Sequence, residues 1–579
     1  MRQSNISRLL ARVGRLLVGT TERRGLDTLE SRQLLAADLS VTLDSLVTTH
    51  DWLVPGDRVV FNVTVTNSGD ETAVGEVDLK TGAQLAEKDI SEEPDLLFSN
   101  RRVFMNLAPG ASLRYKFTGK VPALFTPGDY RLGFGIDVPS QNDSPYASSN
   151  PVNDSNLSNN LAIADGNVGL HYRFGNWIGD TTRTTRTNLR LQVYFNEDGS
   201  EVPETGGDGQ LGGWDDPNWV PPSSMVLINM ALTGGGYGEV TPDGDGMVLT
   251  GTGASSALTF VVRTGSKRMT FEGDVEVQGS LRSFKATGVS FVDSDITVSG
   301  SLGDFSATAM TDSSLTVGSG VVALKFAATD LEDVSIQTPG GISSFRASSW
   351  TTAGDDLDDS QSSGDNSLTA AWVNQLTTLG SSTFDMNLSG EGARNGVALV
   401  RVAAKGVTSG DWSVRGHAGT LAFESTDTGF FATFAGGVSA VSTTGNLSGV
   451  LTAFSMTRVV VRGDLVDATL MAGAFIGDDL DIGGEGSDAD ATPAGATYGV
   501  IGQLAVTRGI INSSIYAGFM PGSEDEGSWI TGQTSAVRKL SVGTELTESI
   551  IFAVTVPARI KIGAAQILTT EYPDVFVTA

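Results

Sequence analysis

The chain has 579 residues, no cysteine, and 38 basic against 67 acidic side chains, which gives a formal net charge of −29. This charge repels phosphate backbones and anionic lipid headgroups, so neither nucleic acid nor a membrane surface is expected as a partner. The lack of cysteine excludes disulfides, thiolate nucleophiles and cysteine-ligated metal sites. Glycine, at 71 residues without a triplet period, exceeds its usual share of about 7% and favours turn-rich β structure.

Residues 1–37 form a basic segment on an otherwise acidic chain. Seven arginines against three acidic residues give it a net charge of +4. Its apolar stretch, Leu9–Val18, contains two of these arginines and is shorter than the roughly 20 residues needed to span a bilayer. No later segment is long and apolar enough either, so no transmembrane helix is expected.

The end of this segment, residues 22–37, reads ERRGLDTLESRQLLAA. It resembles the N-terminal export or sorting element of large planctomycete surface proteins, often written LEPLExRxLLAA, and departs from it at Thr28 and Ser31. The resemblance implies that the protein is exported to the cell surface or beyond. The alternative interpretation is an amphipathic basic helix of unassigned use.

From Asp38 the apolar pattern changes to a period of two. Apolar residues alternate with polar ones along residues 58–66, which is typical of a strand with one buried face. Proline–glycine pairs precede three such segments and preset the turns between them. These pairs are Pro55-Gly56, Pro109-Gly110 and Pro127-Gly128. Residues 38–172 are therefore predicted to form a β-sandwich.

Three motifs of this region occur in a characteristic order. They are LVPGD at 53–57, VTNSG at 65–69 and DSNLSNN at 154–160. Together they resemble the CARDB family, bacterial adhesion-related modules with an immunoglobulin-like fold. The resemblance implies a surface spacer or adhesion unit and supplies no catalytic residues.

Residues 173–223 are interpreted as a linker because they show little periodicity, apart from one predicted strand in which Leu189, Leu191, Val193 and Phe195 alternate with polar residues. The linker contains a pair of tryptophans, Trp214 and Trp219, in the sequence WDDPNW. Their rings could present aromatic faces to a carbohydrate, or they could pack against the following domain.

An internal repeat organises residues 224–570. Phenylalanines recur at 284, 305, 326 and 345, and glycines at 279, 300, 320 and 340 keep the same spacing. A later trio of similar segments begins at Val459, Leu504 and Leu540. A repeat of about 20 residues cannot bury its own core, so stacked coils of a right-handed parallel β-helix are predicted, with a second β-sandwich series as the alternative. The glycines are expected at corners where neighbouring backbones approach closely.

Acidic clusters interrupt this repeat and are predicted to lie on protruding loops. Carboxylates at this density could bind Ca²⁺, although none has EF-hand spacing, and the alternative is a solvated loop that keeps the chain soluble. The candidate calcium ligands are Asp355, Asp356, Asp358, Asp359, Asp478, Asp479, Asp481, Asp488 and Asp490.

Two short segments resemble polygalacturonase motifs: residues 416–419 (GHAG) and residues 559–561 (RIK). About seven coils, or roughly 33 Å, are expected between them, too far to act on one substrate. No catalytic residues are therefore assigned. The predicted function is a non-catalytic surface or adhesion protein whose partner is a cell-surface polysaccharide or protein. The alternative is a polysaccharide lyase or glycosidase built on the β-helix.

Overall fold

The computed structural model describes most of the chain between residues 36 and 577. The described residues are 36–48, 52–88, 95–122, 125, 127–138, 151–177, 186–196, 225–240, 246–263, 268–352, 366–473, 499–518, 536–553, 555–557, 559–568 and 576–577. Their regular structure is β-strand, apart from two 3₁₀ turns at Leu157–Asn159 and Arg394–Gly396. The all-β prediction is confirmed. Among these residues there is no helix long and apolar enough to cross a membrane.

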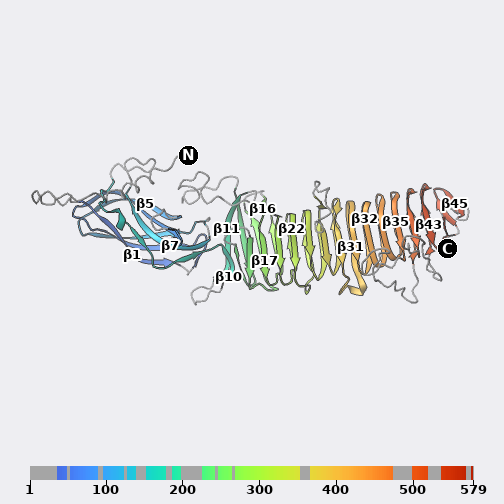
Figure 1. The fold of residues 1–579 in the computed structure, drawn as a ribbon, viewed down its shortest axis with the longest axis horizontal. Coiled ribbons are helices and arrows are strands. Elements are labelled where there is room, and N and C mark those ends of the chain that lie inside the picture. The colour runs from blue at the N-terminus through green and yellow to red at the C-terminus, as the bar shows by residue number, and fades with distance from the viewer. Residues whose placement is uncertain are drawn as a thin grey trace, which may run out of the picture.

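Two antiparallel-rich sheets form the N-terminal sandwich (Figure 1). The first sheet has the order β1-β3-β6, and the second has the order β2-β9-β7-β4-β5 with β8 paired to β7. The strands are β1 (Leu39–Thr48), β2 (Trp52–Leu53), β3 (Arg58–Asn67), β4 (Ala73–Leu85), β5 (Leu96–Leu107), β6 (Ser112–Lys120), β7 (Gly128–Asp137), β8 (Leu161–Ile163) and β9 (Val168–Leu170). The period of two along β3 buries Val59, Phe61, Val63 and Val65, as predicted. Between the sheets, the rings of Phe117 on β6 and Phe134 on β7 lie 5.2 Å apart.

Four antiparallel strands follow the sandwich. They are β10 (Arg173–Trp177), β11 (Arg186–Asn196), β12 (Met225–Thr233) and β13 (Tyr237–Val240). Strand β11 pairs with both β10 and β12, and β10 also pairs with β13. The predicted linker, 173–223, therefore contains two strands that belong to the same sheet as the repeat region. The strand predicted from Leu189 to Phe195 is confirmed as β11, whereas β10 was missed because it has only five residues and its partner β13 is distant in sequence.

From Gly246 onward the pairing is almost entirely parallel, and we call residues 246–577 the parallel array. Each strand pairs with the equivalent strand of the next repeat, so the strands form three columns. Column 1 contains β15 (Ala257–Val262), β18 (Ser283–Thr287), β21 (Asp304–Ser306), β23 (Leu324–Ala327), β25 (Gly341–Ala347), β28 (Trp372–Thr378), the start of β31 (Val397–Val414), both ends of β32 (His417–Thr443), β34 (Val459–Val461), β37 (Leu504–Val506), β41 (Leu540–Val542) and β44 (Arg559–Ile562). Figure 1 shows the array extending away from the sandwich.

The other two columns complete each coil. Column 2 contains β16 (Met269–Phe271), β19 (Val289–Val292), the first parts of β22 (Ala309–Val317) and β24 (Asp330–Gln337), β26 (Ser349–Thr351), β29 (Ser382–Thr383), the middle of β31, β38 (Ile510–Ile511) and β42 (Leu546–Thr547). Column 3 contains β14 (Gly246–Thr250), β17 (Asp274–Gln278), β20 (Asp295–Val298), the second parts of β22 and β24, β27 (Ser367–Ala370), β30 (Asp385–Leu388), the end of β31, the middle of β32, β33 (Leu447–Met456), β35 (Leu465–Ala472), β39 (Ser514–Ala517), β43 (Ile550–Ala553) and β46 (Phe576–Val577). Short strands β36 (Val500–Ile501), β40 (Ala536–Val537) and β45 (Ala565–Leu568) lie beside these columns.

The predicted phenylalanine repeat forms a ladder inside column 1. Phe284, Phe305, Phe326 and Phe345 are buried and occupy paired positions in four successive strands. Their successive ring centroids are 5.4, 5.3 and 4.9 Å apart. The later trio is also in register, since Val459 pairs with Leu504 and Leu504 with Leu540.

The corner between columns 2 and 3 has a conformation that the sequence analysis did not predict. Polar residues there adopt left-handed backbone angles, with φ between 44° and 51°. They are Asp293, Asp312, Asp333, Asp467, Asn512 and Glu548. Asp and Asn tolerate this region better than most side chains because they bond to nearby backbone.

A buried serine follows this corner in several coils. Ser513 is one example: its Oγ donates to the Ile511 carbonyl at 2.7 Å and accepts from the Ala468 amide at 3.2 Å. The Ser549 Oγ in turn accepts from the Ser513 amide at 3.1 Å. These contacts satisfy buried backbone amides and join one coil to the next.

The repeated glycines occupy the tight positions that their spacing predicts. A Cβ added to Gly300 would lie 2.5 Å from the Gly279 carbonyl oxygen, and one added to Gly320 would lie 2.6 Å from the Gly340 Cα. Neighbouring backbones therefore leave no room for a side chain at these corners.

The phenylalanine ladder gives the first testable prediction. Replacing Phe326 by Ala is expected to destabilise the array by about 3–5 kcal/mol, because the cavity would lie between two stacked rings. Phe326→Leu should cost no more than about 1.5 kcal/mol. Urea unfolding followed by tryptophan fluorescence measures both. Equal losses for the two variants would show that the site requires the stacked ring itself and not only the volume that the side chain fills.

Candidate binding sites

The residues predicted from sequence to bind calcium or carbohydrate lie outside the described part of the chain. This holds for both acidic clusters, Asp355–Asp359 and Asp478–Asp490, and for Trp214 and Trp219. Their roles stay predictions.

The two polygalacturonase-like motifs are not brought together. His417 is exposed at the start of β32, where its Nδ1 accepts a hydrogen bond from the Gly437 amide at 2.9 Å. Lys561 lies on β44, five strand spacings further along column 1. At about 4.8 Å per spacing, their backbones are roughly 24 Å apart. One glycosidic bond cannot contact both motifs.

A polar cluster joins the N-terminal strand of the sandwich to the segment after β7. We call Asp38, Asn67, Asp154, Asn159 and Asn160 the terminal polar cluster. Asp154 is its centre: Oδ1 accepts from the Leu39 amide at 3.3 Å and Oδ2 accepts from Asn160 Nδ2 at 2.9 Å. Asn159 Nδ2 donates to Asp38 Oδ1 at 2.9 Å. The third CARDB-like motif, 154–160, thus holds residues 38 and 39 in place.

Two amide oxygens of this cluster lack partners. The Oδ1 atoms of Asn159 and Asn160 are buried and accept no hydrogen bond from a described residue. Asn160 as a whole is only 4% exposed. Buried polar atoms are normally paired, so these two oxygens are open to a hydrogen-bond donor or to a cation. The described residues contain no cluster of three or more carboxylates or histidines placed to hold a metal ion, so a cation here would depend mainly on amide oxygens. Carboxylate and amide oxygens are the donors that Ca²⁺ prefers. Sequence analysis treated 154–160 only as a family motif, although its density of Asp and Asn was a usable signal.

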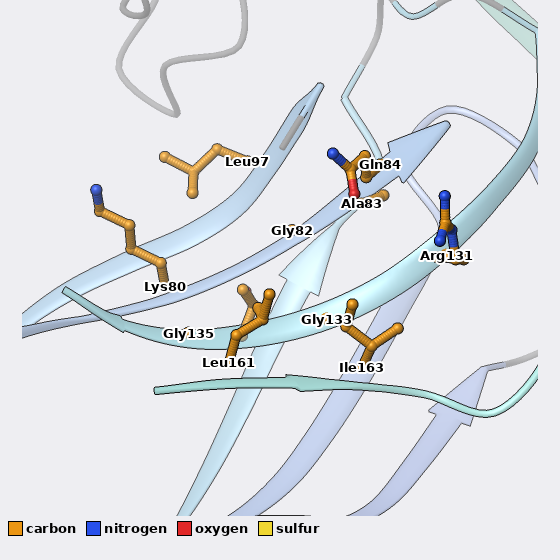
Figure 2. Close-up of a pocket in the computed structure, with 11 residues that line it drawn as sticks. Lys80, Gly82, Ala83, Gln84, Leu97, Arg131, Gly133, Gly135, Leu161 and Ile163 are labelled. Carbon is orange, nitrogen blue, oxygen red and sulfur yellow. The ribbon is translucent and has the colours of Figure 1, made fainter. Parts of the chain in front are cut away.

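A shallow pocket of about 130 Å³ lies on the outer face of the second sheet (Figure 2). Its floor is glycine, because Gly82 on β4 pairs with Gly133 on β7. Leu97 on β5 and Ile163 on β8 flank these glycines in the same cross-strand row. Neither backbone angle nor packing demands glycine at Gly133, where a Cβ would meet its nearest neighbour at 3.4 Å.

The polar side chains at the pocket ends are already engaged. Lys80 Nζ lies 2.7 Å from Asp137 Oδ2, and Arg131 Nη2 donates to the Ala86 carbonyl at 2.7 Å. The eleven lining residues include no histidine and no carboxylate. The pocket can hold a small aliphatic group, but it lacks the acid or base that hydrolysis needs.

A third site is the junction between the sandwich and the array. The Tyr172 hydroxyl accepts a hydrogen bond from the Phe125 amide at 2.7 Å, and the two rings stack 4.5 Å apart. Burial raises the pKa of Tyr172, and the hydrogen bond from Phe125 opposes that shift. The hydroxyl therefore stays neutral and the contact does not change across physiological pH.

Glu239 on β13 completes the junction. Its carboxylate lies 2.9 Å from His171 Nδ1 and 3.0 Å from Arg173 Nε, and the Arg173 guanidinium lies 5.1 Å from the centre of the Trp52 ring. Burial acts to raise the pKa of Glu239, but the hydrogen bonds and charges of His171 and Arg173 outweigh it, so the pKa is lowered. Strands β10 and β13, which precede the parallel array, are thereby tied to the sandwich, because Glu239 contacts His171 after β9 and Arg173 contacts Trp52 on β2.

Comparison with known proteins finds partial similarity. No known family model matches the chain, and no curated protein matches it. The CARDB domain of a Pyrococcus furiosus protein, in a crystal structure with di-metal ions, is 19% identical over 25% of this chain and 99% of that domain, with a TM-score of 0.16. Its solution structure is 16% identical over 24% of this chain and 97% of that domain, with a TM-score of 0.15. A Listeria innocua β-glucosidase in complex with glucose is 16% identical over 23% of this chain and 16% of the enzyme, with a TM-score of 0.14.

The junction predicts a defined pH dependence. Because the folded-state pKa of Glu239 is lowered, its carboxylate stabilises the fold above the unfolded value of about 4.3, and this contribution is lost as the pH falls through the folded-state value. Glu239→Gln should lower the urea midpoint at pH 7 by more than it does at about pH 3. The exposed Glu276→Gln is the control. An equal deficit at both pH values would contradict the electrostatic explanation.

The terminal polar cluster predicts stabilisation by Ca²⁺. A free concentration 100 times the Kd should add about 2.7 kcal/mol, seen as a higher thermal midpoint than with chelator. Asp38→Asn should remove the shift because it removes a ligand charge, whereas a triple Asn variant of Asp478, Asp479 and Asp481 should keep it. The opposite pattern would assign calcium to the acidic loops, and a midpoint insensitive to chelator would exclude both sites.

Proposed function

We propose that this protein is an exported, non-catalytic surface protein in which the parallel array forms a right-handed parallel β-helix that carries the CARDB-like sandwich. The array acts as a stalk and as a binding surface for another surface component. The observation that carries this proposal is the continuity of the core. Buried apolar side chains form one cluster from Ala37 in the sandwich to Ile560 in the last column 1 strand.

This continuity makes the molecule suited to a rigid extended role. Aromatic contacts continue the phenylalanine ladder beyond Phe345, through Trp350 and Phe384 at 4.4 Å and on to Trp412 at 5.4 Å. Together with the Glu239 junction, they couple the described residues of the sandwich to those of the array. A rod of this kind holds its sandwich at a fixed distance and orientation from the far end of the array.

Export is proposed from the basic segment 1–37 and its resemblance to a sorting element. An array stabilised by stacked coils needs no disulfides, so the lack of cysteine is compatible with an extracellular location. The segment itself lies outside the described residues.

The alternative, a polysaccharide lyase or glycosidase, has one feature in its favour. Asp385 and Asp411 are neighbours in column 3, where the Asp411 amide donates to Asp385 Oδ1 at 2.8 Å. Burial and the Asp385 charge raise the pKa of Asp411, as a general acid requires. The same contact joins Asp295 to Asp274 at 2.9 Å, however. Because the same amide–carboxylate contact recurs in different coils, we infer that it helps to start the strands of column 3 and does not serve catalysis. The non-catalytic proposal therefore ranks first.

Cell fractionation with N-terminal sequencing of the mature protein tests the proposal. We expect the protein in the surface or medium fraction, with its N-terminus altered within or after residues 1–37. A cytoplasmic protein that retains Met1 would refute export. Release of reducing or unsaturated sugars from polysaccharide by the purified protein, lost in Asp411→Asn, would instead establish the enzymatic alternative.

A further inference from the structure

Charge is segregated between the three columns of the parallel array. From Met269 onward, the described column 2 and column 3 strands contain no Lys or Arg. Their outward carboxylates include Asp274, Asp295 and Asp330. Column 1 differs, because its strands carry exposed cations. These are Lys285, Lys325, Arg346, Arg401 and Lys561.

The cations of column 1 form a stripe along the axis. Phe284 and its counterparts point inward, so the alternate positions on the same strands face outward. From Lys285 on β18 to Arg401 on β31 there are five strand spacings, or about 24 Å, and Lys561 lies six spacings further. Exposed Arg458, Arg462 and Lys539 flank later strands of the same column. On a chain with a net charge of −29, this alignment defines one cationic face.

Little within the described structure neutralises this face. Lys285 lies 3.7 Å from Asp304, an exposed pair of small energetic value. Lys325, Arg346 and Arg401 form no ion pair with a described carboxylate, and the residues that separate them are small, including Ser306, Ala327 and Ser344. A surface designed only for solubility would mix both signs. The cations of column 1 outnumber its outward carboxylates, Asp304 and Glu424, so the stripe as a whole attracts an extended anion.

Trp372 adds an aromatic surface to the same face. It pairs with Gly341 across β28 and β25, and its half-buried ring covers the position that a Gly341 side chain would take. Lys325 and Arg401 align with Gln375, three residues or about 10 Å along β28 from Trp372. An amphipathic ring held flat against a sheet, with cations beside it, suits a sugar ring that carries an acidic group.

We propose that column 1 binds an extended anionic polysaccharide, with Trp372 stacked on one sugar and Lys325, Arg346 and Arg401 contacting carboxylate or sulfate groups. The inference deepens the proposed binding surface and rests on it. Single-stranded nucleic acid is a poorer fit, since such sites use a series of aromatic side chains, whereas the acidic columns 2 and 3 repel a duplex.

Binding of the full-length protein to polysaccharides of defined charge tests the proposal. Calorimetry against alginate, dextran sulfate and neutral dextran separates carboxylate, sulfate and uncharged ligands. We expect at least one anionic polymer to bind with a salt-dependent affinity and neutral dextran not to bind. The variant Lys325→Gln/Arg346→Gln/Arg401→Gln should lose about tenfold or more in affinity and show a weaker salt dependence.

A matched control removes the same charge elsewhere. The variant Arg114→Gln/Lys116→Gln/Lys120→Gln alters three exposed cations on β6 of the sandwich and should bind like the parent protein. Trp372→Ala should weaken binding without changing its salt dependence. Trp372→Phe should keep most of the affinity of the parent protein. Thermal midpoints check that each variant is folded.

Several results would overturn the proposal. Equal losses in the two triple variants would show that only net charge matters, and no binding to either anionic polymer would exclude the ligand class. Duplex DNA bound as tightly as alginate would indicate a general polyanion surface. Self-association lost only in the column 1 variant would assign the stripe to a second copy. These outcomes concern the purified protein, so they are separable from a failure of export, which fractionation detects.

Discussion

The constraint on which most of this structure depends is the register of one coil on the next. Parallel strands lie about 4.8 Å apart, so each inward side chain must fit directly against its counterpart in the neighbouring coil. This explains why aromatic residues follow one another inside column 1 and why Phe326 and Phe345 lie almost parallel, at 7°. It also explains the corners, where a left-handed Asp or Asn turns the chain and a buried serine such as Ser513 satisfies the amides that the turn exposes.

The same constraint leaves the outward positions free to vary. An outward side chain is not packed against a fixed partner, so its identity can be set by interaction with solvent or a ligand. The three columns use this freedom differently, with carboxylates such as Asp295 on column 3 and cations such as Arg346 on column 1. The parallel array can therefore present opposite charges on different faces, even when the net charge of the chain has a single sign.

The sandwich depends on polar contacts at its two ends. Asp154 fixes the N-terminal strand at one end, and the Tyr172 and Glu239 contacts join the other end to strands β10 and β13, which lead into the array. These partially buried polar groups also fix the geometry of the two ends, because each can bond to all its partners in only a few arrangements. The result is that an apolar core running from Ala37 to Ile560 is held in one arrangement where the chain changes from antiparallel to parallel pairing.

The sequence alone determined the all-β class, the strand period of the sandwich, the spacing of the phenylalanine ladder and the glycine corners, because these depend on patterns that recur at short range. It also indicated the limits of the region that contains the parallel array. The sequence predicted β11 as a strand within a linker but missed β10, since a strand of five residues leaves a weak pattern. Only the tertiary structure decided the contacts between distant residues, such as Glu239 with His171. The cations of column 1 are separated by unequal lengths of chain, because the coils differ in length; they include Lys285, Lys325, Arg346 and Arg401. Only the strand pairing places them on one face.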